Sequence, residues 1–212
     1  MRTEERIVLA MAELLRIQGY GATHVNQLVP AAKAPTGSIY HHFKGGKSEI
    51  AAASLRQAGP VYSQLIGSLL EAHTDLATSI EAVFDAAAED METTGWANMC
   101  PVATITAEVA DTEPELRQVG AEVMSAWVEE GSRYLATRGL SDDQAREVMY
   151  ALITGLEGAF LIARGLRTAE PFRTLGRAVA NYVASMEAER PPRPNARPPR
   201  NARRVRSPRP AR

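Results

Sequence analysis

The sequence predicts an all-α protein of about nine helices, and three observations support this fold class. Apolar residues recur every three or four positions, as at Ile7, Met11, Leu14 and Leu15. Residues that begin or end helices, such as proline, glycine and aspartate, separate these stretches. No stretch of the sequence shows the strict alternation of apolar and polar residues that marks a half-buried strand. We therefore expect layers of helices packed on one another.

The first two helices are short and closely spaced. Residues 3–18 carry one apolar stripe, and Gly19 follows where a C-terminal cap needs a left-handed residue. A second helix is expected to begin near Thr23 or His24, with Thr23 as its N-cap. It must end before Pro35, which cannot continue that helix but suits the first turn of the next one.

The third helix, residues 36–43, has an unusual polar face. Ile39 and Phe43 are four residues apart, so they share one buried face. The rest of the surface carries short hydrogen-bonding groups, which suit base edges in a DNA major groove. Two short helices, a tight turn and a polar third helix predict a helix-turn-helix. The residues expected to contact double-stranded DNA are Thr23, Thr36, Gly37, Ser38, Tyr40, His41 and Lys47.

These residues divide by expected role. Tyr40 and Lys47 are expected to contact phosphates and set the register of the protein on DNA, helped by Thr23 near a helix N-terminus. Gly37 allows close approach to the duplex. The remaining three, Thr36, Ser38 and His41, are expected to face the groove.

From residue 3 to 53 the chain resembles the TetR family of bacterial one-component repressors. The matching residues are Gly19-Tyr20, Thr23, the run Gly37 to Phe43, and Lys47. The glycine pair in HHFKGGK and the segment Cys100-Pro101-Val102-Ala103 resemble the LmrA/YxaF-like branch. Two residues depart from the family pattern: Lys33 stands where a turn glycine is usual, and Pro30 lies inside the second helix, which predicts a late start or a bend.

Beyond Lys47 the chain is expected to be helical to about residue 187. Pro60 predicts a kink in the long first helix of this region, and Ser141-Asp142-Asp143 is a strong helix start. The expected helices are 48–70, 75–91, one from 101, 115–137, 142–164 and 171–187.

We expect three regions with contrasting charge. Residues 1–47 form the helix-turn-helix DNA-binding domain, with six Lys/Arg against three acids, a charge of +3. Residues 48–189 form an all-helical effector-binding and dimerisation domain with nine bases against 22 acids, a charge of −13. Residues 190–212 hold nine arginines, seven prolines and no acid, and we expect a disordered Arg/Pro-rich tail. A basic head suits phosphate neutralisation, although many bacterial domains are acidic without such a role.

The last two helices are candidates for a homodimer interface. Residues 150–165 are apolar on nearly every face, which marks either a central core helix or one shared with a partner. The resemblance implies pairing across a two-fold axis, and hence a pseudo-palindromic operator. The expected interface residues are Tyr150, Ile153, Gly155, Gly158, Leu161, Ile162, Leu175, Val179, Tyr182 and Val183.

The resemblance also implies a cavity for a small-molecule effector, apolar or aromatic in character. Aromatic and methionine side chains make adaptable cavity walls, although at helical spacing they also form ordinary cores. The candidates are Tyr62, Phe84, Met91, Trp96, Met99, Glu108, Met124 and Trp127. Their types do not identify a ligand.

Other function classes find little support in the sequence. Three of the four histidines lie in the first 47 residues, and we find no metal-ligand spacing, phosphate loop or serine elbow, so we expect no enzyme, metal or cofactor. A single cysteine, Cys100, fits a reducing cytoplasm, with redox sensing left open. No uninterrupted apolar run of membrane-spanning length occurs, so no membrane insertion is expected. The alternative function is a non-specific binder of nucleic acid or anionic surfaces, driven by the arginine-rich tail.

Overall fold

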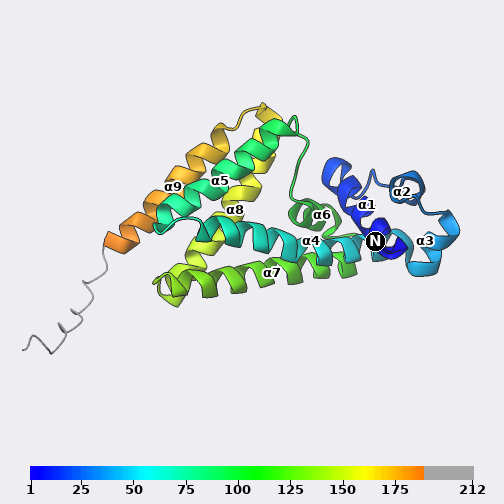
Figure 1. Cartoon of the computed structure of the whole chain (residues 1–212), viewed down its shortest axis with the longest axis horizontal. Helices are drawn as coiled ribbons and strands as arrows, with labels where there is room; N and C mark the ends of the chain where they lie inside the picture. Colours follow the sequence, from blue (N-terminus) through cyan, green and yellow to red (C-terminus); the bar gives the residue numbers. More distant parts are fainter. Residues whose placement is uncertain (189–212) are drawn as a thin grey trace, which may run out of the picture.

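The computed structural model describes residues 1–188 of the 212-residue chain, and within this part it confirms the all-α prediction with nine helices. The predicted tail, 190–212, lies outside the described residues. Figure 1 shows α1–α3 at one end and α5, α8 and α9 at the other, joined by α4, α6 and α7. The helices are α1 Thr3–Gln18, α2 Val25–Ala32, α3 Thr36–His42, α4 Gly46–Glu71, α5 Leu76–Thr93, α6 Pro101–Val109, α7 Pro114–Thr137, α8 Asp142–Leu166 and α9 Glu170–Ala188.

The turn after α2 is built around a strained residue. Lys33 adopts the left-handed conformation with φ 49°, a conformation that favours glycine. Arg6 of α1 supports the turn, because its Nε donates to the carbonyl of Ala32 at 3.0 Å. The N-cap of α2 is His24 rather than the expected Thr23: the His24 backbone N–H donates to the side chain of Gln27 at 2.7 Å.

Helix α4 connects the two ends of the molecule, with α7 packed along it (Figure 1). It continues past Pro60 to Glu71 as one helix. The carbonyls at its end lack partners within the helix. Arg138, just after α7, provides hydrogen-bond donors here. Its guanidinium donates to the carbonyl of Leu70 in the last turn and to the carbonyls of His73 and Thr74 just beyond the helix, at 2.8 to 3.1 Å.

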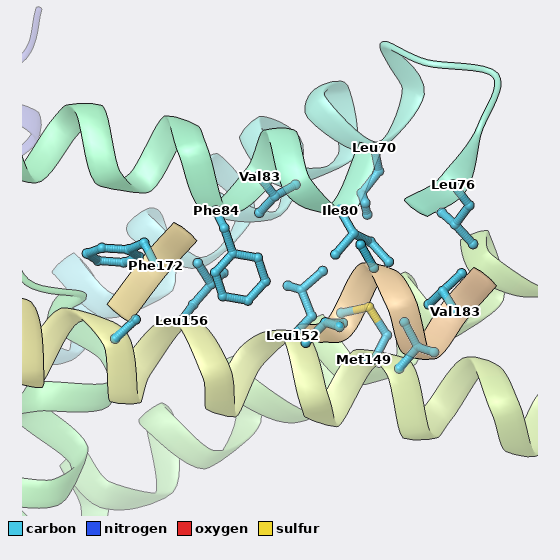
Figure 2. Packing of buried hydrophobic residues seen from close by; sticks show 14 of the residues in the cluster. Leu70, Leu76, Ile80, Val83, Phe84, Met149, Leu152, Leu156, Phe172 and Val183 are labelled. Atoms are coloured by element: carbon cyan, nitrogen blue, oxygen red, sulfur yellow. The ribbon is translucent and has the colours of Figure 1, made fainter. Parts of the chain in front are cut away.

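The core of the body lies between α5, α8 and α9. Phe84 of α5 and Phe172 of α9 are fully buried, and Leu152 and Leu156 of α8 point toward them (Figure 2). Helix α8 is the one helix in the described part that is long and apolar enough to cross a membrane by composition alone. Its stripe of buried residues in this cluster identifies it as a core helix.

A second core lies in the head and extends into the body. Ile7 of α1, Ile39 of α3 and Ile50 of α4 cluster with Val102 and Ile105 of α6, and all five are completely buried. Figure 1 shows α6 lying beside α1 and α4. The head therefore shares its hydrophobic core with a helix that belongs in sequence to the body.

Removing the ring of Phe84 tests the body core. Phe84→Ala is expected to lower the free energy of unfolding by about 3–5 kcal/mol, because it removes a fully buried ring and leaves a cavity. The measurement is urea denaturation followed by circular dichroism. Val61→Ala on α4, where the side chain is 58% exposed, is the control. Equal losses in the two variants would contradict this description of the core.

Candidate DNA-binding face and effector cavity

Helix α3 separates its residues as the sequence predicts for a DNA-reading helix. Ile39 is fully buried and Phe43, which follows the helix, is 4% exposed, so both anchor α3 to the head. Tyr40 is 49% exposed. A methyl group at Gly37 would meet nothing within 4 Å, so this side of the helix is open. The residues expected to meet DNA, Thr36, Gly37, Tyr40 and His41, are exposed, and Ser38 is half-buried.

Two of the predicted DNA contacts have roles inside the protein. Thr23 is completely buried, and its hydroxyl donates to the carbonyl of Gly19 at 2.6 Å, so its side chain secures the α1–α2 turn. Lys47 is half-buried, with its Nζ 4.0 Å from the centre of the Tyr20 ring. Burial lowers the pKa of Lys47, and the nearby carboxylates of Glu108 and Glu113 oppose this shift. Phosphate contact by Lys47 remains a prediction.

Two carboxylates of the body hold the head. Glu108, at the end of α6, accepts hydrogen bonds from the backbone N–H of Tyr20 at 2.8 Å and of Gly21 at 2.5 Å. Glu113, before α7, accepts from the Tyr20 hydroxyl at 3.1 Å and from Ser48 at 3.3 Å. These bonds join residues far apart in sequence, so they tie the turn after α1 and the start of α4 to the body.

A cavity of about 220 Å³ lies in the body, and we call it the body cavity. Its walls come from α4, α5, α7, α8 and the segment that leads into α6. Most of the wall is aliphatic or aromatic, as in typical small-molecule sites. Its polar lining residues are Tyr62, Asp90, Asn98, Cys100 and Glu157.

The predicted ligand residues are distributed over the molecule. Tyr62, Met99 and Trp127 line the body cavity. The two aromatic rings pack against each other, with the centroids of Tyr62 and Trp127 6.4 Å apart. The Trp127 indole N–H also donates to the carbonyl of Gly59 at 2.8 Å. The other candidates lie elsewhere. Phe84 and Met91 are buried in the body core, Trp96 packs against it, Met124 packs against the head core, and Glu108 binds the head.

Burial changes the acid–base properties of the cavity's polar groups. It raises the pKa of Glu157 to about 7, and a hydrogen bond from the Cys100 thiol partly offsets this shift. Burial also raises the pKa of Tyr62 to about 12 and that of Cys100 well above its usual range. A raised cysteine pKa disfavours the reactive thiolate.

Sequence reasoning missed Asp90, Asn98 and Glu157 as cavity residues. For Glu157 a signal was available, because it is the single charged residue between positions 148 and 163, in an otherwise apolar helix. An ionisable group in such a setting is expensive to bury and therefore marks a candidate site. No comparable local signal distinguishes Asp90 from the other acids of α5.

The predicted dimer residues fall into two groups. Leu161 and Ile162 of α8 are 66% and 51% exposed, Tyr150 and Tyr182 are also exposed, and Gly158 faces open space. Leu166, 68% exposed, extends this apolar surface. The other predicted residues pack within the chain: Ile153, Gly155, Leu175, Val179 and Val183 face the body cavity or the body core.

Comparisons with known proteins agree with this geometry. Residues 7–53 match the sequence model described as bacterial regulatory proteins, tetR family, and residues 77–178 match that of the C-terminal domain of LmrA/YxaF-like transcriptional regulators. The HTH-type transcriptional regulator LmrA of Bacillus subtilis is 28% identical over 181 residues, covering 85% of this chain and 96% of LmrA. The uncharacterized regulator YxaF of the same organism is 27% identical, covering 76% of this chain and 84% of YxaF.

Solved structures show the same fold. A TetR transcriptional regulator from Chloroflexus aurantiacus superposes with a TM-score of 0.69 at 26% identity, covering 87% of this chain and 95% of the other. A TetR-family regulator from Cytophaga hutchinsonii superposes with a TM-score of 0.75 at 20% identity, covering 89% and 96%.

The carboxylate of Glu108 can be tested by amide exchange. Glu108→Gln is expected to speed hydrogen exchange at the Tyr20 and Gly21 amides about tenfold, because charge-assisted bonds to both N–H groups are weakened. The measurement is amide exchange by NMR. Glu115→Gln, an exposed acid in the first turn of α7, is the matched control. Unchanged exchange at both amides would show that Glu108 does not hold the turn.

Proposed function

Because the chain belongs to the TetR family of transcriptional regulators, with an LmrA/YxaF-like C-terminal domain, we propose that it is a homodimeric repressor. The family is DNA-binding and non-enzymatic. The proposed operator is a pseudo-palindrome, and the proposed inducer is a small apolar or aromatic molecule. The observation that carries the proposal is the exposed polar face of α3, standing on a core that continues through α6 toward the body cavity.

DNA contact is proposed to divide between phosphates and base edges. Tyr40 stands exposed beside the start of α4, where a methyl group at Gly46 would lie 3.7 Å from its ring, so it can reach a phosphate flanking the groove. Thr36, Ser38 and His41 present hydroxyl and imidazole groups to base edges. A two-fold dimer would place two such helices on one face of the duplex.

Dimerisation is proposed to bury the exposed apolar surface of α8. Tyr150 and Leu161 are eleven positions apart, about three turns of α8, and Ile162 and Leu166 are four positions apart on a neighbouring line of the helix, while other residues of α8 pack in the body core. A surface of this kind on an isolated chain favours association with a second copy.

Release from DNA is proposed to follow from two connections between cavity and head. Helix α4 lines the body cavity with Tyr62, and its first turn contains Lys47, which lies against Tyr20 of the head. Helix α6 begins directly after Cys100, a cavity residue, and ends at Glu108, which binds the turn after α1. A ligand that prefers one placement of these helices would shift the population toward it and change the spacing of the two heads.

Substitutions in the head test the DNA proposal. Lys47→Ala and Tyr40→Phe are expected to weaken binding to all duplexes, and Lys47→Ala to reduce the slope of log K against log salt by about 0.9, since one phosphate contact is lost. Ser38→Ala and Thr36→Ala are expected to change sequence preference instead, by about 1–3 kcal/mol at the affected base pair. The measurement is fluorescence anisotropy with an operator selected from random DNA.

The matched control is Arg177→Ala, an exposed base on α9 far from the head. A Lys47→Ala protein that binds its operator with wild-type affinity and salt slope would refute the phosphate assignment.

One charge in the proposed interface tests dimerisation. Leu161→Glu is expected to shift the protein from dimer to monomer, because an unpaired charge cannot be buried at low cost. Sedimentation velocity measures the change, with Val61→Glu on the exposed surface of α4 as control. If Leu161→Glu remains fully dimeric at micromolar concentration, the interface lies elsewhere.

A further inference from the structure

The described lining of the body cavity contains acidic residues but no basic ones. Two of its lining residues are acids, Asp90 of α5 and Glu157 of α8, and none of the described residues that line it is lysine, arginine or histidine. Two bases outside the lining are engaged with other groups, although the charge of Arg16 also acts on Tyr62 and Asp90 of the lining. Arg16 of α1 pairs with Glu13 at 2.6 Å, and Arg164 of α8 donates to the carbonyl of Ala97 at 3.4 Å.

One acceptor in the cavity wall has no partner. The Oδ1 of Asn98 is buried and accepts no hydrogen bond within the described structure. The other end of the same amide is held, because its Nδ2 donates to Asp90 at 2.5 Å. A buried acceptor without a donor costs free energy, and because protein atoms cover this oxygen, it is not a contact point for a ligand in the cavity.

Glu157 lies in the same wall and faces groups that cannot neutralise it. The other polar residues of this wall are neutral or acidic: Cys100 before α6, Tyr62 of α4 and Asp90 of α5. Because the carboxylate is largely removed from water and no base pairs with it, its pKa is raised to about 7. A cation in the cavity would restore the interaction that burial removes.

The remainder of the wall suits an apolar ring system. Tyr62, Trp127 and Phe160 present aromatic rings, and aliphatic side chains of α4, α5 and α8 fill the spaces between them. Aromatic rings also attract cations through their negative faces.

We infer, on the premise that the body cavity is the effector site, that it selects a lipophilic monocation: a small aromatic body carrying one protonated amine, whose N–H group binds the Glu157 carboxylate. This deepens the proposed function by giving the inducer a charge. It distinguishes the cavity from a purely apolar one, which would take a neutral ligand equally well.

Three probes of nearly equal size separate charge from shape. They are 2-(1-naphthyl)ethylamine, which is cationic at neutral pH, 2-(1-naphthyl)ethanol, which is neutral, and 1-naphthylacetate, which is anionic. Titration calorimetry with the purified full-length protein at pH 7.5 is expected to show the amine binding about tenfold or more tightly than the alcohol, and the acetate more weakly than either.

Variants assign the preference to Glu157. Glu157→Gln is expected to bring the affinity for the amine down to that for the alcohol, and a circular dichroism spectrum that matches the wild type shows that the variant is folded. Glu89→Gln, an exposed acid on α5 outside the lining, is the matched control and should keep the wild-type ratio of amine to alcohol affinity.

Amine binding should also tighten as pH rises from 6 to 8 in the wild type, because only ionised Glu157 attracts the cation and the amine stays protonated throughout. Glu157→Gln should lose this pH dependence.

The failures of the two proposals are distinguishable. If the alcohol binds as tightly as the amine, or if Glu157→Gln keeps the amine's advantage, the inferred charge preference is wrong and the effector cavity stands. If none of the three probes binds the wild-type protein, the cavity is not an effector site for ligands of this size, and the inference falls with that assignment.

Discussion

Burial of α6 against the head is the interaction on which the rest of this structure depends. The three head helices have 16, 8 and 7 residues, too few to enclose a large core by themselves. Val102, Ile105 and Val109 of α6 complete that core. The head therefore shares its core with the segment that leads from the body cavity. Any change in the placement of α6 must be felt by the helices that position α3.

Carboxylates serve opposite purposes at the two ends of this connection. At the head, Glu108 accepts the backbone N–H groups of Tyr20 and Gly21, so its charge is satisfied by groups the chain supplies. At the cavity, no basic residue of the described lining accompanies Glu157. The first arrangement stabilises a fixed contact between two parts of the protein. The second leaves binding capacity for a molecule that brings its own donors.

Helix α8 is apolar both where it packs in the body core and where it faces outward. One side contributes Leu152 and Leu156 to the body core, and the other exposes Leu161, Ile162 and Leu166. Glu157 lies between them at the cavity. A nearly continuous apolar sequence is needed because both sides of the helix are to be removed from water, one by the chain itself and the other by the proposed partner. The strongly acidic charge of residues 48–189 then belongs to the other surfaces, which need not approach DNA.

The sequence by itself determined the helices, the helix-turn-helix and the division of α3 into buried and exposed faces, because these depend on contacts between residues close in the chain. Ser141 caps α8 and Asp75 caps α5 through bonds to residues three positions on. Only the tertiary structure decided which side chains share the cavity. Glu108 was predicted to be a polar contact for the ligand, but it accepts hydrogen bonds from the turn at Tyr20 and Gly21, 88 and 87 residues away in the sequence. Phe84 was predicted to line the cavity, but it is buried in the body core. Helical periodicity indicates which face of a helix is buried, but not which other helix covers it, and that choice depends on the packing of the whole chain.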